Sequence, residues 1–169
     1  LAELDVAPQA VSDIVITHAH FDHMGSIGEF PKAQIHIQKS ELLSCYEALA
    51  LPRHFAHLSA IVDPENMRMA LEASIEHRVN LIDGDRDNVL PGIHVRLGPG
   101  HTPGHQFVIV ETARGKRVIS GDCLYTTRQL TGHTQDGVYA PLNNATGSAW
   151  EQLRTLDRVN AEIGGDLDK

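Results

Sequence analysis

The stretch that decides the fold is residues 18–23, which read His-Ala-His-Phe-Asp-His. It follows the apolar run 14–16, so it begins where a buried strand is expected to end. Three imidazoles and one carboxylate in six residues are donors that suit zinc, manganese, iron and cobalt. Because the His-x-His pair and the Asp-His pair are expected to point in different directions, the spacing predicts two adjacent metal sites. A histidine-rich polar surface loop is the alternative.

Two further polar clusters lie beside predicted strands. Residues 98–105 read Gly-Pro-Gly-His-Thr-Pro-Gly-His, and two glycines with two prolines are typical of a rigid loop that carries ligands. Residues 120–125 read Ser-Gly-Asp-Cys-Leu-Tyr and directly follow an apolar run. The Asp122 carboxylate can bridge two cations because its two oxygens offer several lone pairs. For Asp122 alone, a turn or helix-capping role is the alternative.

Composition narrows the class of protein. The chain has 169 residues, fits one domain, and contains no apolar run long enough to span a bilayer. Its net charge of -8, from 14 Lys and Arg against 22 Asp and Glu, argues against a nucleic-acid partner. The two cysteines are predicted to be unpaired, which is compatible with a cytoplasmic location. Eleven histidines are the unusual feature of the composition.

The chain is expected to mix strands and helices. A helix is predicted over 148–163, because apolar residues recur there at helical spacing. The residues of this apolar face are Trp150, Leu153, Leu156 and Val159. The predicted strands are 13–17, the region of 35–37, 93–97, 107–110 and 117–120, and the other predicted helices are 40–50 and 63–77.

The order of the three clusters resembles the metallo-β-lactamase superfamily. This resemblance implies an α/β fold, the αββα sandwich, with a dinuclear site at one edge between its two sheets. It also implies that one metal is held by His18, His20 and His105, and the other by Asp22 and His23, with Asp122 bridging both. His101 is expected to support the loop or a ligand and not to bind metal itself. The implied cofactors are two divalent ions, Zn²⁺ above all, with iron, manganese or cobalt as alternatives.

Within the superfamily, Tyr125 and Phe21 resemble the N-acyl-homoserine lactonase group. The resemblance implies a small-molecule lactone or ester substrate, opened by a metal-bridging hydroxide. Tyr125 is expected to bind the substrate and stabilise the oxyanion, and Asp22 to transfer the proton to the leaving oxygen. Phe21 is expected to contact the acyl chain. For Tyr125, a buried packing role is the alternative.

Three other functions stay open: a glyoxalase-type thioesterase, another ester hydrolase of the same fold, and a catalytically incomplete metal-binding fragment. We expect residues 1–169 to be a fragment of a single domain, without N-terminal strands. The family also places one more histidine ligand after the helix at 148–163, and the sequence ends before it.

Overall fold

A computed structural model describes residues 1–141 and 146–168. The chain forms two compact units, Leu1–Ile82 and Asp83–Lys169. That residues 1–169 belong to a single domain stays a prediction. Residues 142–145 and 169 of that range lie outside the described residues. In the described part of the chain, no helix is both long and apolar enough to cross a bilayer.

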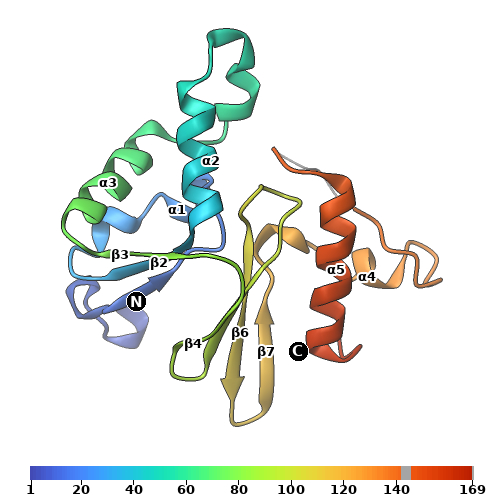
Figure 1. The fold of residues 1–169 in the computed structure, drawn as a ribbon. Coiled ribbons are helices and arrows are strands. Elements are labelled where there is room, and N and C mark those ends of the chain that lie inside the picture. The colour runs from blue at the N-terminus through green and yellow to red at the C-terminus, as the bar shows by residue number, and fades with distance from the viewer. Residues whose placement is uncertain (142–145, 169) are drawn as a thin grey trace. The chain divides into compact units, whose positions relative to one another are not determined.

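The first unit contains a three-stranded parallel sheet (Figure 1). Its strands, in spatial order, are β1 (Asp13–Val15), β2 (Gln34–Gln38) and β3 (Val79–Ile82). Its helices are α1 (Phe21–Met24), α2 (Lys39–Ala50) and α3 (Pro64–Ile75), and the segment Arg53–Ser59 forms a 3-10 helix. Three shorter 3-10 turns are Ala2–Leu4, Pro8–Ala10 and Ile27–Glu29.

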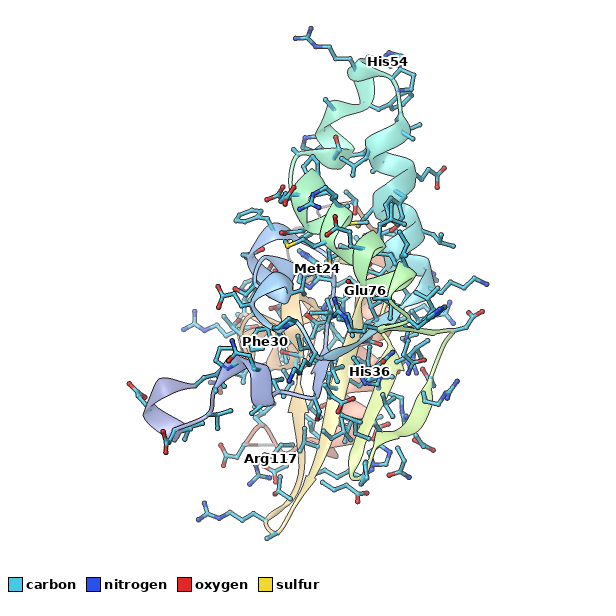
Figure 2. All side chains as sticks on the ribbon, turned by 90° about the vertical axis from the view of Figure 1, so that its left-hand side faces the viewer. Met24, Phe30, His36, His54, Glu76 and Arg117 are labelled. Atoms are coloured by element: carbon cyan, nitrogen blue, oxygen red, sulfur yellow. The ribbon has the colours of Figure 1, made fainter. Side chains whose placement is uncertain are left out.

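Alternating side chains of β2 divide the first unit into an apolar and a polar side. Ile35 and Ile37 are buried in a core that also contains side chains of α2 and α3. His36, between them in sequence, faces the opposite way because side chains alternate along a strand. Its Nε2 lies 2.8 Å from Asp13 Oδ1 on β1, and its Nδ1 lies 3.0 Å from the Asn80 amide on β3. Figure 2 labels His36 in the sheet.

The second unit contains a four-stranded antiparallel sheet in sequence order. Its strands are β4 (Arg86–Leu90), β5 (Ile93–Leu97), β6 (Gln106–Thr112) and β7 (Gly115–Ile119). A 3-10 turn, Gly121–Cys123, follows β7, and the two helices are α4 (Arg128–Thr131) and α5 (Ala149–Ile163). The core joins Phe107 and Ile109 of β6 to Val159 of α5.

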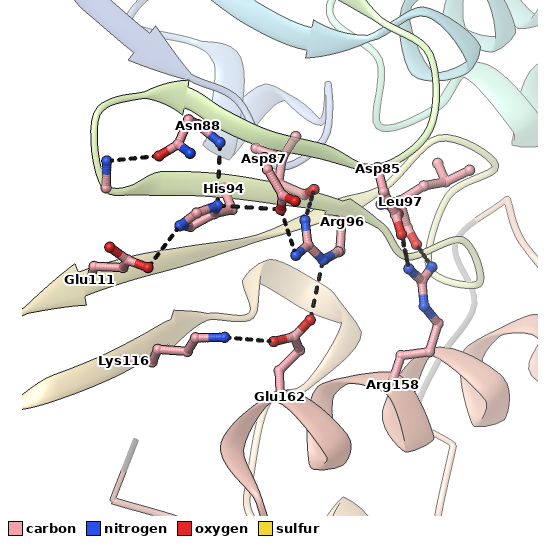
Figure 3. A network of polar contacts seen from close by, with 12 residues as sticks. Asp85, Asp87, Asn88, His94, Arg96, Leu97, Glu111, Lys116, Arg158 and Glu162 are labelled. Atoms are coloured by element: carbon pink, nitrogen blue, oxygen red, sulfur yellow. Dashed lines mark hydrogen bonds and ion pairs between the residues drawn. The ribbon is translucent and has the colours of Figure 1, made fainter.

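A network of charged side chains connects the sheet of the second unit with α5 (Figure 3). The Arg96 guanidinium contacts Asp87 at 2.8 Å and Glu162 at 3.1 Å, and Lys116 lies 3.5 Å from Glu162. Farther along the same helix, Arg158 pairs with Asp85 at 2.6 Å. Since Glu162 and Arg158 belong to α5, these pairs hold the helix in register with the sheet.

Each predicted strand and helix overlaps an element of the structure, and four features differ from the prediction. The helix predicted to begin at Ser40 begins one residue earlier, because α2 starts at Lys39 and Gln38 is its N-cap residue. Trp150 is 72% exposed, so it does not belong to the buried face of α5 that Leu156 and Val159 form. The strands β3 and β4 were not predicted, and residues 21–24 of the expected loop form the helical turn α1. The two sheets in a mixed α/β chain agree with the predicted fold class.

Candidate functional site

The histidine-rich loop lies in the first unit, between β1 and the end of α1. The Phe21 N–H donates to the Ile61 carbonyl at 3.1 Å, and the His23 N–H donates to the His20 carbonyl at 3.0 Å. These bonds turn the chain back on itself. Consequently the side chains of His18 and His23 come together although five positions separate them.

The three imidazoles of this loop form one cluster with His18 in the middle. His18 Nε2 lies 3.0 Å from His20 Nδ1, and the rings of His18 and His23 have centroids 4.1 Å apart. The expectation that His23 points away from His18 is therefore wrong, because the α1 turn reverses the direction of the chain. Asp22 Oδ2 lies 3.6 Å from His23 Nε2, at the exposed side of the cluster.

A buried carboxylate supports the histidine-rich loop, and sequence analysis did not find it. Glu41, in the first turn of α2, has 0% of its surface exposed. Its Oε1 accepts the backbone N–H of Ala19 at 2.8 Å. Ala19 stands between His18 and His20, so this bond fixes the backbone from which both imidazoles project. A glutamate on a helix is usually a surface residue, and only the contact across 22 positions reveals its role.

The loop at residues 98–105 lies in the second unit and is tied to α5. Thr155 of α5 donates to the Pro99 carbonyl at 2.7 Å, and the N-cap residue Ser148 donates its N–H to the Gly100 carbonyl at 3.0 Å. Gly100 has φ +137°, and a Cβ there would lie 2.4 Å from the Gln152 backbone. Glycine is thus required for the close approach of loop and helix.

Asp122 contacts the other residues of the second unit that the sequence singled out. Its backbone N–H donates to His105 Nε2 at 3.1 Å, and the Tyr125 hydroxyl donates to its Oδ2 at 2.8 Å. The same Oδ2 lies 3.4 Å from Nε2 of the buried His101. His101 therefore contacts a predicted ligand, and its supporting role stays a prediction.

Gln129 of α4 is a second supporting residue that sequence analysis missed. It is 2% exposed, and its Oε1 accepts the backbone N–H groups of Tyr125 at 2.6 Å and Thr126 at 3.1 Å. Its amide nitrogen lies 3.5 Å from the Cys123 carbonyl. One neutral side chain thus fixes the backbone on both sides of Leu124, and with it the placement of Tyr125.

The donors in each unit fit a divalent cation by their chemistry. Neutral imidazole nitrogen and carboxylate oxygen are ligands that zinc and its neighbours accept. In the first unit, three imidazoles lie within contact of one another and beside Asp22. In the second, the carboxylate of Asp122 lies beside two imidazoles, since its Oδ2 is 3.4 Å from His101 Nε2 and its backbone N–H is 3.1 Å from His105 Nε2.

The remaining predicted site residues, Phe21 and Asp22, lie on α1 with exposed side chains. Phe21 is 55% exposed. Half of the Tyr125 surface is also exposed, and its hydroxyl is hydrogen-bonded to Asp122. The alternative of a buried packing role for Tyr125 therefore has no support from its burial.

The sequence of the chain is similar to that of known proteins. The profile of the metallo-beta-lactamase superfamily matches residues 1–163. An N-acyl homoserine lactonase of Bacillus thuringiensis is 32% identical over 127 residues, which are 75% of this chain and 44% of that protein. The N-acyl homoserine lactonase AttM of Azorhizobium caulinodans is 30% identical over 174 residues, covering 98% of this chain and 62% of the relative.

Solved structures give the same fold. An N-acyl homoserine lactone hydrolase, with the product N-hexanoyl-L-homoserine bound at its catalytic metal centre, superposes with a TM-score of 0.68 at 24% identity. AidC, described as a dizinc quorum-quenching lactonase, superposes with a TM-score of 0.68 at 21% identity. The matches cover 98% of this chain but 56% and 57% of those chains. The chain thus spans about half the length of the relatives it matches, and the predicted resemblance is confirmed.

Proposed function

Because the chain belongs to the metallo-beta-lactamase superfamily, whose profile matches residues 1–163, we propose that the full-length protein is a metal-dependent lactonase. Its proposed substrate class is a small lactone of the N-acyl-homoserine type. The family match supports divalent-metal binding, and the names of the relatives support lactone hydrolysis. The observation that carries the choice of reaction is the Tyr125 hydroxyl at 2.8 Å from the Asp122 carboxylate.

The metal ligands are proposed from the donor clusters of the two units. His18, His20 and His105 would hold one divalent ion, Asp22 and His23 the other, and Asp122 both. Zn²⁺ is the proposed ion because imidazole and carboxylate ligands suit it. When bound, such ions would lower the pKa of a water molecule to about 7 and polarise a carbonyl oxygen.

Tyr125 is proposed to stabilise the oxyanion that forms when water attacks the lactone carbonyl. Its phenol is a hydrogen-bond donor, and half of the residue is exposed, so a substrate can reach it. To act, the hydroxyl turns its proton from Asp122 Oδ2 to the carbonyl oxygen. The cost of this exchange is small because one hydrogen bond replaces another.

Asp22 and Phe21 are proposed to act from α1. The Asp22 carboxylate is exposed and accepts the proton from the attacking water, then returns it to the alkoxide that leaves when the ring C–O bond breaks. The exposed ring of Phe21 offers an apolar surface to the acyl chain. Proton and bond changes balance, because the product is one hydroxy acid from one lactone and one water.

The test compares two substrates with the full-length protein. Proton release is followed during hydrolysis of N-hexanoyl-homoserine lactone and of S-lactoylglutathione, before and after treatment with a metal chelator. We expect lactone opening that stops on chelation, and slow or no thioester hydrolysis. Faster hydrolysis of the thioester would instead assign the protein to the glyoxalase-type reaction.

A further inference from the structure

We propose that Glu41 is an anionic positioning residue: it fixes the histidine-rich loop and supplies negative charge that favours a cation on His18, His20 and His23. This inference rests on the metal binding in the proposed function, but not on the lactone as substrate.

The contact itself shows that Glu41 serves the histidine-rich loop. Glutamate in the first turn of a helix commonly interacts with the helix dipole and the free N–H groups there. Glu41 instead accepts the Ala19 N–H at 2.8 Å, which is 22 positions away in sequence. Through this bond the α2 helix holds the residue between two of the three clustered histidines.

An acidic residue at this buried position needs an explanation beyond the hydrogen bond. Burying a carboxylate costs much more free energy than burying an amide, and the residue is fully buried. A glutamine would accept the same N–H with its neutral carbonyl oxygen. A negative charge at this place becomes favourable when a cation binds to neighbouring neutral imidazoles.

A neighbouring thiol responds to the same charge. Burial raises the pKa of the Cys45 thiol to about 12, and the Glu41 carboxylate adds to this increase. Cys45 lies one helical turn beyond Glu41 on α2 and is buried in the apolar core of the unit. Glu41 and Cys45 thus share one buried environment, in which charges interact more strongly than they do in water.

The test removes the charge and keeps the acceptor. Metal-free full-length protein is titrated with Co²⁺ against a competing chelator, and the visible absorption of bound Co²⁺ is recorded. The variants are Glu41→Gln and, as a matched control, Glu47→Gln on the exposed side of the same helix. Residues that support metal ligands usually contribute 10- to 100-fold to metal affinity, so we expect a loss of about 10-fold or more for Glu41→Gln. Glu47→Gln is expected to bind as the wild type does.

Unchanged Co²⁺ affinity and an unchanged spectrum in Glu41→Gln would overturn the inference. If Glu41→Gln fails to fold, Glu41→Asp is compared with Glu41→Asn, because both shorten the side chain by one methylene and differ from each other only in charge. Co²⁺ binding that is about 10-fold or more tighter in Glu41→Asp than in Glu41→Asn supports the role of charge, whereas equal affinities contradict it. A protein that binds Co²⁺ but opens no lactone would refute the proposed function and leave the result for Glu41 standing.

Discussion

The histidine-rich loop of the first unit and the Asp122 loop of the second are each held by one buried side chain, and these two side chains differ in charge. Glu41 accepts one backbone N–H beside three imidazoles, whereas Gln129 accepts two backbone N–H groups beside a carboxylate. The acidic residue Glu41 thus supports a loop whose proposed ligands are mostly neutral imidazoles, and the neutral residue Gln129 supports a loop whose proposed ligand, Asp122, is acidic. Such a division avoids placing two carboxylates together without a cation.

The largest expected effect comes from removing a proposed metal ligand from either of the two units. His18→Ala or His105→Ala should leave the full-length protein with at most one of two metal ions, since each removes a nitrogen donor proposed for the first ion. Metal content is measured by elemental analysis of the purified protein. His54→Ala is the control, because His54 is exposed at the outer end of the α2 and Arg53–Ser59 segment (Figure 2). Full metal content in both ligand variants would break the assignment.

The second prediction concerns Gln129, the neutral side chain that supports the Asp122 loop. Gln129→Ala leaves the N–H groups of Tyr125 and Thr126 without their acceptor, and a buried donor left unpaired costs about 1–3 kcal/mol. We expect the free energy of unfolding in urea to fall by about 2 kcal/mol. Arg128→Ala, at the exposed neighbouring position of α4, should change it by less than about 0.5 kcal/mol. Equal stability of the two variants would show that the Gln129 contacts contribute little.

The third prediction concerns the group that Gln129 positions. Tyr125→Phe removes the hydroxyl and keeps the ring, so we expect lactone turnover to fall about 10- to 30-fold, or about 1–2 kcal/mol. Metal content should stay the same, because Tyr125 is not a proposed ligand. The measurement is the steady-state rate of proton release by both full-length proteins. Equal rates would exclude a role of the hydroxyl in the reaction.

The smallest expected effect is a pH dependence in the first unit, away from the two loops. Hydrogen bonds from His36 and then Ser12 lower the pKa of the Asp13 carboxyl below its ordinary value of 3.8. A lowered pKa in the folded state stabilises that state above the ordinary value, and this stabilisation disappears as the pH falls through the lowered pKa. Metal-free Asp13→Asn should therefore be less stable than the wild type by at most about 1 kcal/mol near pH 6. The difference should shrink below about pH 4.

Urea unfolding of the wild type, Asp13→Asn and the exposed control Glu3→Gln across this pH range measures that difference. A difference between the wild type and Asp13→Asn that stays constant to the lowest pH would mean that the carboxyl ionisation does not stabilise β1 against β2.

Local sequence signals predicted much of the fold. Asp63 caps α3 and accepts the Glu65 N–H at 2.9 Å, which agrees with the helix predicted from residue 63. Ser148 and Gly164 delimit α5, and Gly164 adopts the left-handed conformation with φ 62°. These features depend on neighbouring residues, which is why the sequence alone sufficed.

Features that depend on distant contacts were not predictable in the same way. The α1 turn is anchored by the Ile61 carbonyl, some 40 positions from Phe21, and it brings His23 to His18. Helical periodicity identified the apolar face of α5 but not that Trp150 lies beyond its buried part. From the sequence alone, Glu41 and Gln129 resemble ordinary surface residues of helices. Their roles become visible only when the structure shows which backbone N–H groups donate hydrogen bonds to them.

The proposal that the histidine-rich loop and the Asp122 loop bind the same metal ions in the full-length protein is tested by anomalous X-ray diffraction from its crystals. Data collected on both sides of the zinc absorption edge locate each bound ion without reference to activity. We predict two anomalous peaks, one bound by His18, His20 and His105 and the other by Asp22 and His23, with Asp122 bound to both. Peaks on only one of the two loops, or no peak on either loop in zinc-saturated crystals, would contradict the account.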